Sequence, residues 1–329
     1  MSHPSLATCC LISTGGTIAM KVDPVKQAPV PALSGDELLA LVPEIAEYAN
    51  LKVNNLANTP SSYMGPDQWI ELQGAVTREL EKPDVAGVVV THGTDTLEET
   101  AWFLDLTVSS SKPVVLIGAQ RNASEPDFDG PRNLLNAVKV CVCPEARDLG
   151  AMVVLNSQIN AARDVAKTHT AHVEAFQSGT FGLLGEVWDD RIVIARRPVK
   201  RQFLPLTAST LPRVDIVSMY AGADGCLIRA AVAAGAKGIV VQGLGLGNVN
   251  LEIYEAIVEA IADGVQVLMS TRVQQGRVRP HYGFVGGGKT LAEAGVLFGD
   301  DLSPQKARIL LMLALQSVTD PAQIQDLFN

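Results

Sequence analysis

The sequence of 329 residues contains little cysteine, few aromatic side chains and no long apolar run. Its five cysteines are an odd number at low density, which excludes a disulfide-stapled scaffold and favours buried, reduced thiols. No apolar run approaches the roughly 18 residues that a transmembrane helix needs. A basic block is also lacking: 26 Lys and Arg against 35 Asp and Glu give a net charge of −9, which disfavours nucleic acid and membrane surfaces as partners.

Signals for targeting, metal binding and dinucleotide binding are lacking too. The first residues show neither the basic nor the apolar region of a signal peptide, and together with the few cysteines this predicts a cytoplasmic protein. No histidine spacing suits a metal, and His169 and His172 are predicted to be a solvated pair. The dinucleotide fingerprint G-x-G-x-x-G does not follow the first predicted strand.

Apolar residues make up 47% of the chain, enough for full-sized cores, and they fall into short solid runs between helical patterns. Solid runs are typical of strands buried on both faces of a parallel sheet, so the predicted class is α/β. The predicted strands are residues 9–12, 88–91, 114–117, 152–155, 214–218, 238–241 and 265–269. The predicted helices are residues 35–41, 68–82, 97–107, 131–142, 227–234, 251–263, 304–316 and 321–328, the last with Asp320 as N-cap before Pro321.

A basic stretch interrupted by prolines indicates a domain boundary. Residues 196–201 read R-R-P-V-K-R, and Pro205 and Pro212 follow shortly after. We therefore expect a larger N-terminal domain at residues 1–190, a linker at 191–213 and a smaller C-terminal α/β domain at 214–329.

Hydroxyl and acidic side chains follow two of the predicted strands directly. Residues 13–18, S-T-G-G-T-I, come after the first strand, and residues 91–99, T-H-G-T-D-T-L-E-E, come after the second and open a helix. A tight glycine turn and a helix cap by Thr94 or Asp95 would explain part of each pattern. Ligands of open parallel sheets, however, bind beyond the carboxyl ends of the strands, where these hydroxyls are expected to lie.

One pattern points to a different class of protein. From Gly283 to Thr290 the sequence fits G-x-x-x-x-G-K-T, the phosphate-binding P-loop. A P-loop follows a buried strand and opens a long helix, whereas a polar stretch containing Pro280 precedes this one and Gly295 ends the helical pattern early. Nucleotide binding therefore stays only as an alternative, which ATP-dependent thermal stabilisation would favour.

Residues 14–18, T-G-G-T-I, and 91–100, T-H-G-T-D-T-L-E-E-T, resemble the two signatures of the bacterial-type L-asparaginase family. Other family-like blocks run along essentially the whole chain. They are residues 118–121 (G-A-Q-R), 129–134 (D-G-P-R-N-L), 222–225 (G-A-D-G), 247–250 (G-N-V-N) and 302–308 (L-S-P-Q-K-A-R). The resemblance implies hydrolysis of L-asparagine to L-aspartate and ammonia, with no metal or organic cofactor.

The resemblance also implies roles for residues of this sequence. Thr17 matches the threonine nucleophile, and Thr94 matches the second catalytic threonine, which would position the water that cleaves the acyl ester. Asp95 and Lys167 match the aspartate and lysine that complete the catalytic cluster. A threonine hydroxyl is a weak nucleophile until a base or a charge activates it, which such a cluster can supply.

Substrate binding is implied for further positions. Ser61 matches the serine that holds the substrate α-carboxylate, and Asp95 would also bind the α-ammonium. The backbone near Gly93 is a candidate oxyanion hole. Ser62 stands beside Ser61 where the family often has Gln or Glu. The family pattern also implies that Asn248 approaches the substrate of a neighbouring chain, and hence a homotetramer built from dimers.

The sequence departs from the family pattern in the loop after the first signature. Residues 18–35 contain no tyrosine, although the family usually has one there. The loop has three prolines and few apolar anchors, so it is expected to be mobile when the site is empty. Tyr63 is the nearest tyrosine to a site motif and is a candidate replacement; the alternative is packing of its ring against Met64 and Trp69. The carboxylate that a neighbouring subunit often lends cannot be aligned around residues 286–293.

The predicted function is an L-asparaginase acting through a threonine nucleophile and an acyl-enzyme. Within the enzyme class the alternative is a dual glutaminase-asparaginase. A catalytically silent amino-acid sensor on the same fold is disfavoured, because Thr17, Thr94, Asp95 and Lys167 are all present.

Overall fold

The computed structural model describes residues 6–199 and 201–329. The chain divides into two compact units, Met1–Phe203 and Leu204–Asn329. Residues 1–5, on which the expected absence of a signal peptide depends, and Lys200 of the predicted linker lie outside the described residues.

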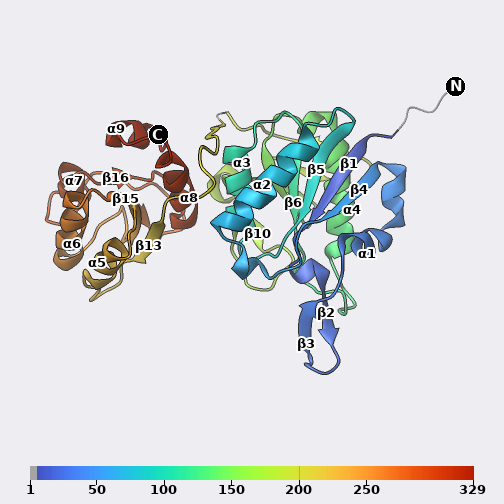
Figure 1. The fold of residues 1–329 in the computed structure, drawn as a ribbon, viewed down its shortest axis with the longest axis horizontal. Coiled ribbons are helices and arrows are strands. Elements are labelled where there is room, and N and C mark those ends of the chain that lie inside the picture. The colour runs from blue at the N-terminus through green and yellow to red at the C-terminus, as the bar shows by residue number, and fades with distance from the viewer. Residues whose placement is uncertain (1–5, 200) are drawn as a thin grey trace. The chain divides into compact units, whose positions relative to one another are not determined.

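A mostly parallel sheet forms the centre of the first unit (Figure 1). Its strand order is β12-β11-β8-β7-β6-β5-β1-β4, with parallel pairing from β7 to β4 and antiparallel pairing from β12 to β7. The strands are β1 (Thr8–Ser13), β4 (Asn50–Asn55), β5 (Val85–Thr91), β6 (Val114–Ile117), β7 (Ala151–Leu155), β8 (Gln158–Ala161), β11 (Gly185–Val187) and β12 (Ile192–Ile194). The last of these strands lies within the predicted linker.

Helices cover both faces of this sheet. α2 (Pro66–Leu80) and α3 (Leu97–Thr107) pack on one face, and α1 (Gly35–Ala40) and α4 (Gly130–Val142) share a core with the other (Figure 1). Strands β1, β5, β6 and β7 are therefore buried almost throughout, which explains their solid apolar runs. Short 3-10 turns complete the unit at Thr17–Ala19 (η1), Pro43–Glu47 (η2), Ser61–Tyr63 (η3), Pro144–Ala146 (η4) and Gly179–Phe181 (η5).

The second unit is a smaller parallel α/β sheet. Strands β13 (Val214–Ser218), β14 (Gly238–Gly243), β15 (Gln266–Thr271) and β16 (Leu297–Phe298) lie in chain order. Its helices are α5 (Cys226–Ala233), α6 (Leu251–Ala262), α7 (Gly288–Glu293), α8 (Pro304–Ala314) and α9 (Pro321–Asp326). The predicted fold class is confirmed, as is the cap of α9, where the Asp320 side chain accepts a hydrogen bond from Ala322 N.

Several local expectations are wrong. Residues 20–31 form a hairpin of β2 (Met20–Asp23) and β3 (Ala28–Pro31) instead of an irregular loop. The N-cap of α3 is Thr96, without a side-chain cap, so the expected cap by Thr94 or Asp95 does not form. Cys226 is exposed rather than buried, because it begins the surface helix α5.

Candidate active site

The order in which the strands join the sheet reverses at β1. From β1 the chain passes to β4 on one side and then to β5 on the other. A crevice beyond the carboxyl ends of the strands is expected at such a switch point. The segments that carry Thr17, Ser61 and Thr94 follow β1, β4 and β5, so all three emerge at this edge of the sheet.

Glycine makes a close contact between these segments possible. A Cβ atom on Gly16, where φ is +88°, would lie 2.3 Å from the Cα of Gly93, so no larger residue fits. A Cβ atom on Gly93 would in turn lie 2.6 Å from the Ser61 Oγ. The two signature segments and Ser61 therefore meet, and Thr17 is the residue next to this contact.

The two threonines of the first signature have different environments. Thr14 is buried, and its Oγ1 donates a 2.7 Å hydrogen bond to Thr91 O, which ties the end of β1 to that of β5. Thr17 is half-buried in η1, and its hydroxyl has no hydrogen-bond partner among the described residues. Thr14 therefore has a structural role, whereas the Thr17 hydroxyl remains available to react.

Lys167 meets Thr94 and Asp95, although it follows them by more than 70 residues in sequence. The Lys167 Nζ donates to Thr94 Oγ1 at 2.9 Å and to Asp95 Oδ1 at 2.7 Å. Thr94 is buried, whereas the Asp95 side chain is 73% exposed. The carboxylate is therefore open to a cationic ligand while the lysine stays shielded.

The backbone around Lys167 is held by a residue that the sequence analysis did not select. Lys167 ends the two-residue strand β9 (Ala166–Lys167), which pairs with β10 (Phe176–Gln177). Its backbone N–H donates to the carboxylate of Glu98, in the first turn of α3. Glu98 looks locally like a residue that suits the positive end of a helix, so only the long-range contact reveals this second role.

His92 is also part of the support of the site. It is fully buried, and its Nδ1 lies 2.7 Å from Gly93 O, to which it must donate. Its Nε2 therefore accepts from Thr100 Oγ1 at 2.9 Å, and that oxygen accepts from Trp69 Nε1. Burial lowers the pKa of His92 from 6.5 to about 4, so the ring is neutral and fixes the backbone at Gly93.

The remaining predicted site residues of the first unit differ in their exposure. Ser61 is 4% exposed and its carbonyl accepts from Thr96 Oγ1 at 2.7 Å, whereas Ser62 is exposed. Tyr63 is 72% exposed, so the alternative of a ring packed against Met64 and Trp69 is wrong, and its phenol is accessible.

Asn248 lies in the second unit, in a turn closed by paired backbone hydrogen bonds with Leu244. Its Oδ1 is buried and has no hydrogen-bond partner among the described residues.

The P-loop alternative finds no structural support. The segment from Gly283 to Thr290 does not directly follow a strand, and its helix α7 is only six residues long. In the described part of the chain, no cluster of three or more His, Cys, Asp or Glu is arranged to bind a metal ion. None of the helices described there is long and apolar enough to cross a membrane.

Comparison with known proteins extends the similarity over both units. Residues 8–200 match the family described as "Asparaginase, N-terminal", and residues 213–328 match "Glutaminase/Asparaginase C-terminal domain". The chain is 41% identical to L-asparaginase 2 of Bacillus subtilis (strain 168), covering 97% of this chain and 85% of that protein. It is 34% identical to the glutaminase-asparaginase of Pseudomonas fluorescens biotype A, and the match covers 98% of this chain and 90% of that protein.

The fold similarity is equally extensive. The crystal structure of a probable cytoplasmic L-asparaginase from Campylobacter jejuni superposes with a TM-score of 0.90 at 37% identity. The match covers 98% of this chain and 99% of that one.

Proposed function

The chain belongs to the glutaminase/asparaginase family, and from that premise we propose that it hydrolyses the side-chain amide of L-asparagine to L-aspartate and ammonia. The observation that carries the proposal is the pair of hydrogen bonds from Lys167 to Thr94 and Asp95, at the sheet edge where the backbone of Gly16 touches Gly93. This arrangement brings a free hydroxyl, a charged cluster and backbone donors to one edge of the sheet.

The chemistry requires a nucleophile and a leaving group that gains a proton. Thr17 Oγ1 attacks the amide carbon and loses its proton, and the C–N bond breaks as the nitrogen is protonated and leaves as ammonia. The backbone N–H groups of Gly93 and Thr94 are the candidate donors to the oxyanion. The Asp95 carboxylate is the proposed partner of the substrate ammonium, and Ser61 that of its carboxylate.

Water then cleaves the ester on Thr17. Because the Thr94 Oγ1 accepts a bond from Lys167, it keeps one lone pair and its own hydrogen for a water molecule. The three hydrogens of the Lys167 ammonium allow it to hold Thr94 and Asp95 together, which keeps the Thr94 hydroxyl oriented toward the water molecule. Hydrolysis regenerates the Thr17 hydroxyl and releases L-aspartate.

Ammonia release, measured on L-asparagine and L-glutamine side by side, tests the proposal. Thr17→Ala should lower kcat by several orders of magnitude, as removal of a covalent nucleophile does, while the fold is retained. Far-UV circular dichroism and the melting temperature serve as controls for folding. Near-normal turnover by this variant would overturn the assignment of Thr17.

A dual glutaminase-asparaginase is the second candidate. The observation in its favour is the 34% identity over 333 residues to a glutaminase-asparaginase. Comparable kcat/KM on both amides would establish it, whereas a large preference for L-asparagine would exclude it.

Location and assembly are also proposed here. The fold similarity to a probable cytoplasmic L-asparaginase supports a cytoplasmic location for this protein, which cell fractionation would test.

We further propose a homotetramer of dimers in which Asn248 reaches the substrate of a neighbouring chain. In support, the Oδ1 of Asn248 has no hydrogen-bond partner among the described residues and so retains an unused acceptor.

A further inference from the structure

The loop after β6 begins at the sheet edge that carries the second signature. We call residues 118–129 the bracket loop. A Cβ atom on Gly118 would lie 2.9 Å from both Thr94 Cγ2 and His92 O, so the start of the loop packs against the second signature. Asp129 closes the loop by accepting the N–H groups of Gln120 and Arg121 at 3.1 and 2.9 Å. The backbone at Arg121 is therefore fixed relative to Thr94.

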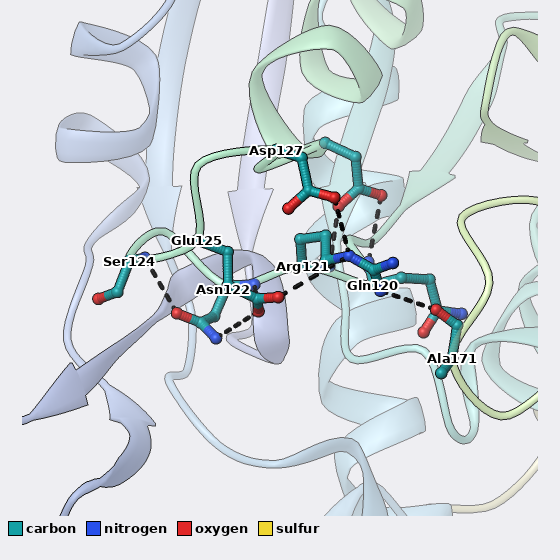
Figure 2. Close-up of polar contacts among 8 residues, drawn as sticks. Gln120, Arg121, Asn122, Ser124, Glu125, Asp127 and Ala171 are labelled. Carbon is teal, nitrogen blue, oxygen red and sulfur yellow. Dashed lines mark hydrogen bonds and ion pairs between the residues drawn. The ribbon is translucent and has the colours of Figure 1, made fainter.

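The Arg121 side chain leaves this loop and binds the segment that carries Lys167. Its Nη1 donates to Ala171 O at 2.8 Å, and its Nε lies 3.2 Å from an Asp127 carboxylate oxygen and 3.8 Å from one of Glu125 (Figure 2). Ala171 is in the middle of residues 168–175, which connect β9 to β10. Arg121 thus holds the tip of the hairpin in which Lys167 stands.

The same loop holds the strand that follows Thr17. Glu125 accepts from Asn122 N at 2.9 Å and from Asn122 Nδ2 at 2.6 Å, which shapes the turn shown in Figure 2. From this turn Ala123 N donates to Met20 O at 2.9 Å, and Ser124 Oγ accepts from Val22 N at 3.0 Å. One loop therefore contacts both the base of the β2–β3 hairpin and the hairpin that carries Lys167.

We propose that Arg121 is a positioning residue for Lys167, linking the bracket loop to the β9–β10 hairpin so that the ammonium is preorganised against Thr94 and Asp95. This inference rests on the proposed function. The strand that carries Lys167 has only two residues, so the contact at the tip adds a restraint that the pairing with β10 does not give. Partly exposed ion pairs add little to stability, so the effect of Arg121 is expected in kcat and not in the melting temperature.

The test compares Arg121→Met and Arg121→Lys with the control Arg132→Met. Arg132 lies on α4 and pairs with Asp189 at 2.6 Å, but its side chain is 59% exposed and, among the described residues, forms no hydrogen bond or ion pair with either hairpin. Arg121→Met should lower kcat about 10- to 100-fold, with a smaller change in KM and a shifted pH profile of kcat. Arg121→Lys should restore part of the loss, and Arg132→Met should behave like wild type.

A double variant separates positioning from general support. In the Lys167→Met background, Arg121→Met should cause little further loss of kcat, because it acts through the side chain already removed. Multiplying losses would overturn the proposal. So would wild-type kcat in Arg121→Met, or a fall that only follows a lower melting temperature.

Hydrogen exchange gives a readout that does not need activity. Amides in residues 166–177 should exchange faster in Arg121→Met than in wild type or Arg132→Met, and unchanged exchange would refute the contact. If the wild-type chain releases no ammonia from either amide, the proposed function fails, while this measurement still decides whether Arg121 holds the hairpin.

Discussion

Burial of the His92 ring makes the stability of the folded chain sensitive to acid. Burial lowers its pKa from 6.5 to about 4, so below pH 6.5 the unfolded chain binds a proton that the folded chain does not. The stabilisation is therefore fully present above pH 6.5 and is lost as the pH falls toward 4. The shift corresponds to about 3 kcal/mol, since one pKa unit is about 1.4 kcal/mol.

Urea unfolding midpoints of wild type and His92→Gln, measured between pH 7.5 and 4.5, would check this expectation. The variant should be less stable at neutral pH, because it disturbs bonds to Gly93 and Thr100, but the difference should shrink as the pH falls. A constant difference for His92→Gln over the whole range would contradict the prediction.

The hydrogen bonds of Lys167 predict that two residues act as one unit. Because Lys167 Nζ binds Thr94 Oγ1 directly, Thr94→Val and Lys167→Met should each lower kcat strongly, and the double variant should be little worse than the more damaging single variant. Steady-state kcat of the four proteins completes the cycle. Independent, multiplying losses would show that Lys167 is only a structural partner of Thr94.

At the scale of elements, the sequence predicts the helices and strands whose burial leaves a solid or periodic apolar pattern. Strands β6 and β13 and helix α3 have the predicted bounds, because solid apolar runs and helical periodicity mark them. Strand β4, N-L-K-V-N-N, was missed because it is an edge strand with polar, partly exposed side chains. Prolines in β3 also concealed the β2–β3 hairpin, although an exposed hairpin of this kind tolerates them.

The residues of the site divide in the same way: local motifs mark some of them, and only tertiary contacts reveal the others. Thr17 and Thr94 lie in short contiguous motifs, so the sequence and its resemblance to the family were enough to predict them. The support given by Glu98 and Arg121 to the Lys167 segment spans 69 and 50 residues respectively. Such contacts depend on the tertiary fold, and locally both residues look like ordinary surface charges.

The β2–β3 hairpin projects beyond the edge of the sheet where the site lies (Figure 1). Its turn is open to solvent: Val25 is 90% exposed, and the N–H groups of Val25 and Lys26 are held only by the Asp23 side chain. Closure of this hairpin over bound ligand would exclude water and make the turn less accessible.

Limited trypsin digestion tests this closure. Cleavage after Lys26 should be fast in the free enzyme and slower with saturating L-aspartate, as followed by mass spectrometry. Arg191, which is exposed in the connection between β11 and β12 of the same unit, provides the control site, whose cleavage rate should not change. An unchanged rate at Lys26 under conditions where L-aspartate inhibits turnover would show that the hairpin does not close.

At the scale of the whole molecule, the proposed assembly makes the active site a property of two chains. One chain would supply Thr17 and its cluster, and a neighbour would supply Asn248. Multi-angle light scattering should then show an active tetramer and no active monomer. Neighbouring sites related by a twofold axis would each use one copy of both residues.

Mixing two inactive variants distinguishes a shared site from a self-contained one. Thr17→Ala and Asn248→Ala homo-oligomers should each have low activity, because every site in them lacks one component. After dissociation and random reassociation at equal concentrations, half of the dimer pairs are hybrids, and one of the two sites in each hybrid has both native residues. Activity should therefore recover to about one quarter of wild type, since half of one half of the sites are restored. If Asn248 served only its own chain, each hybrid would contain one site lacking Thr17 and one lacking Asn248, and mixing would restore nothing.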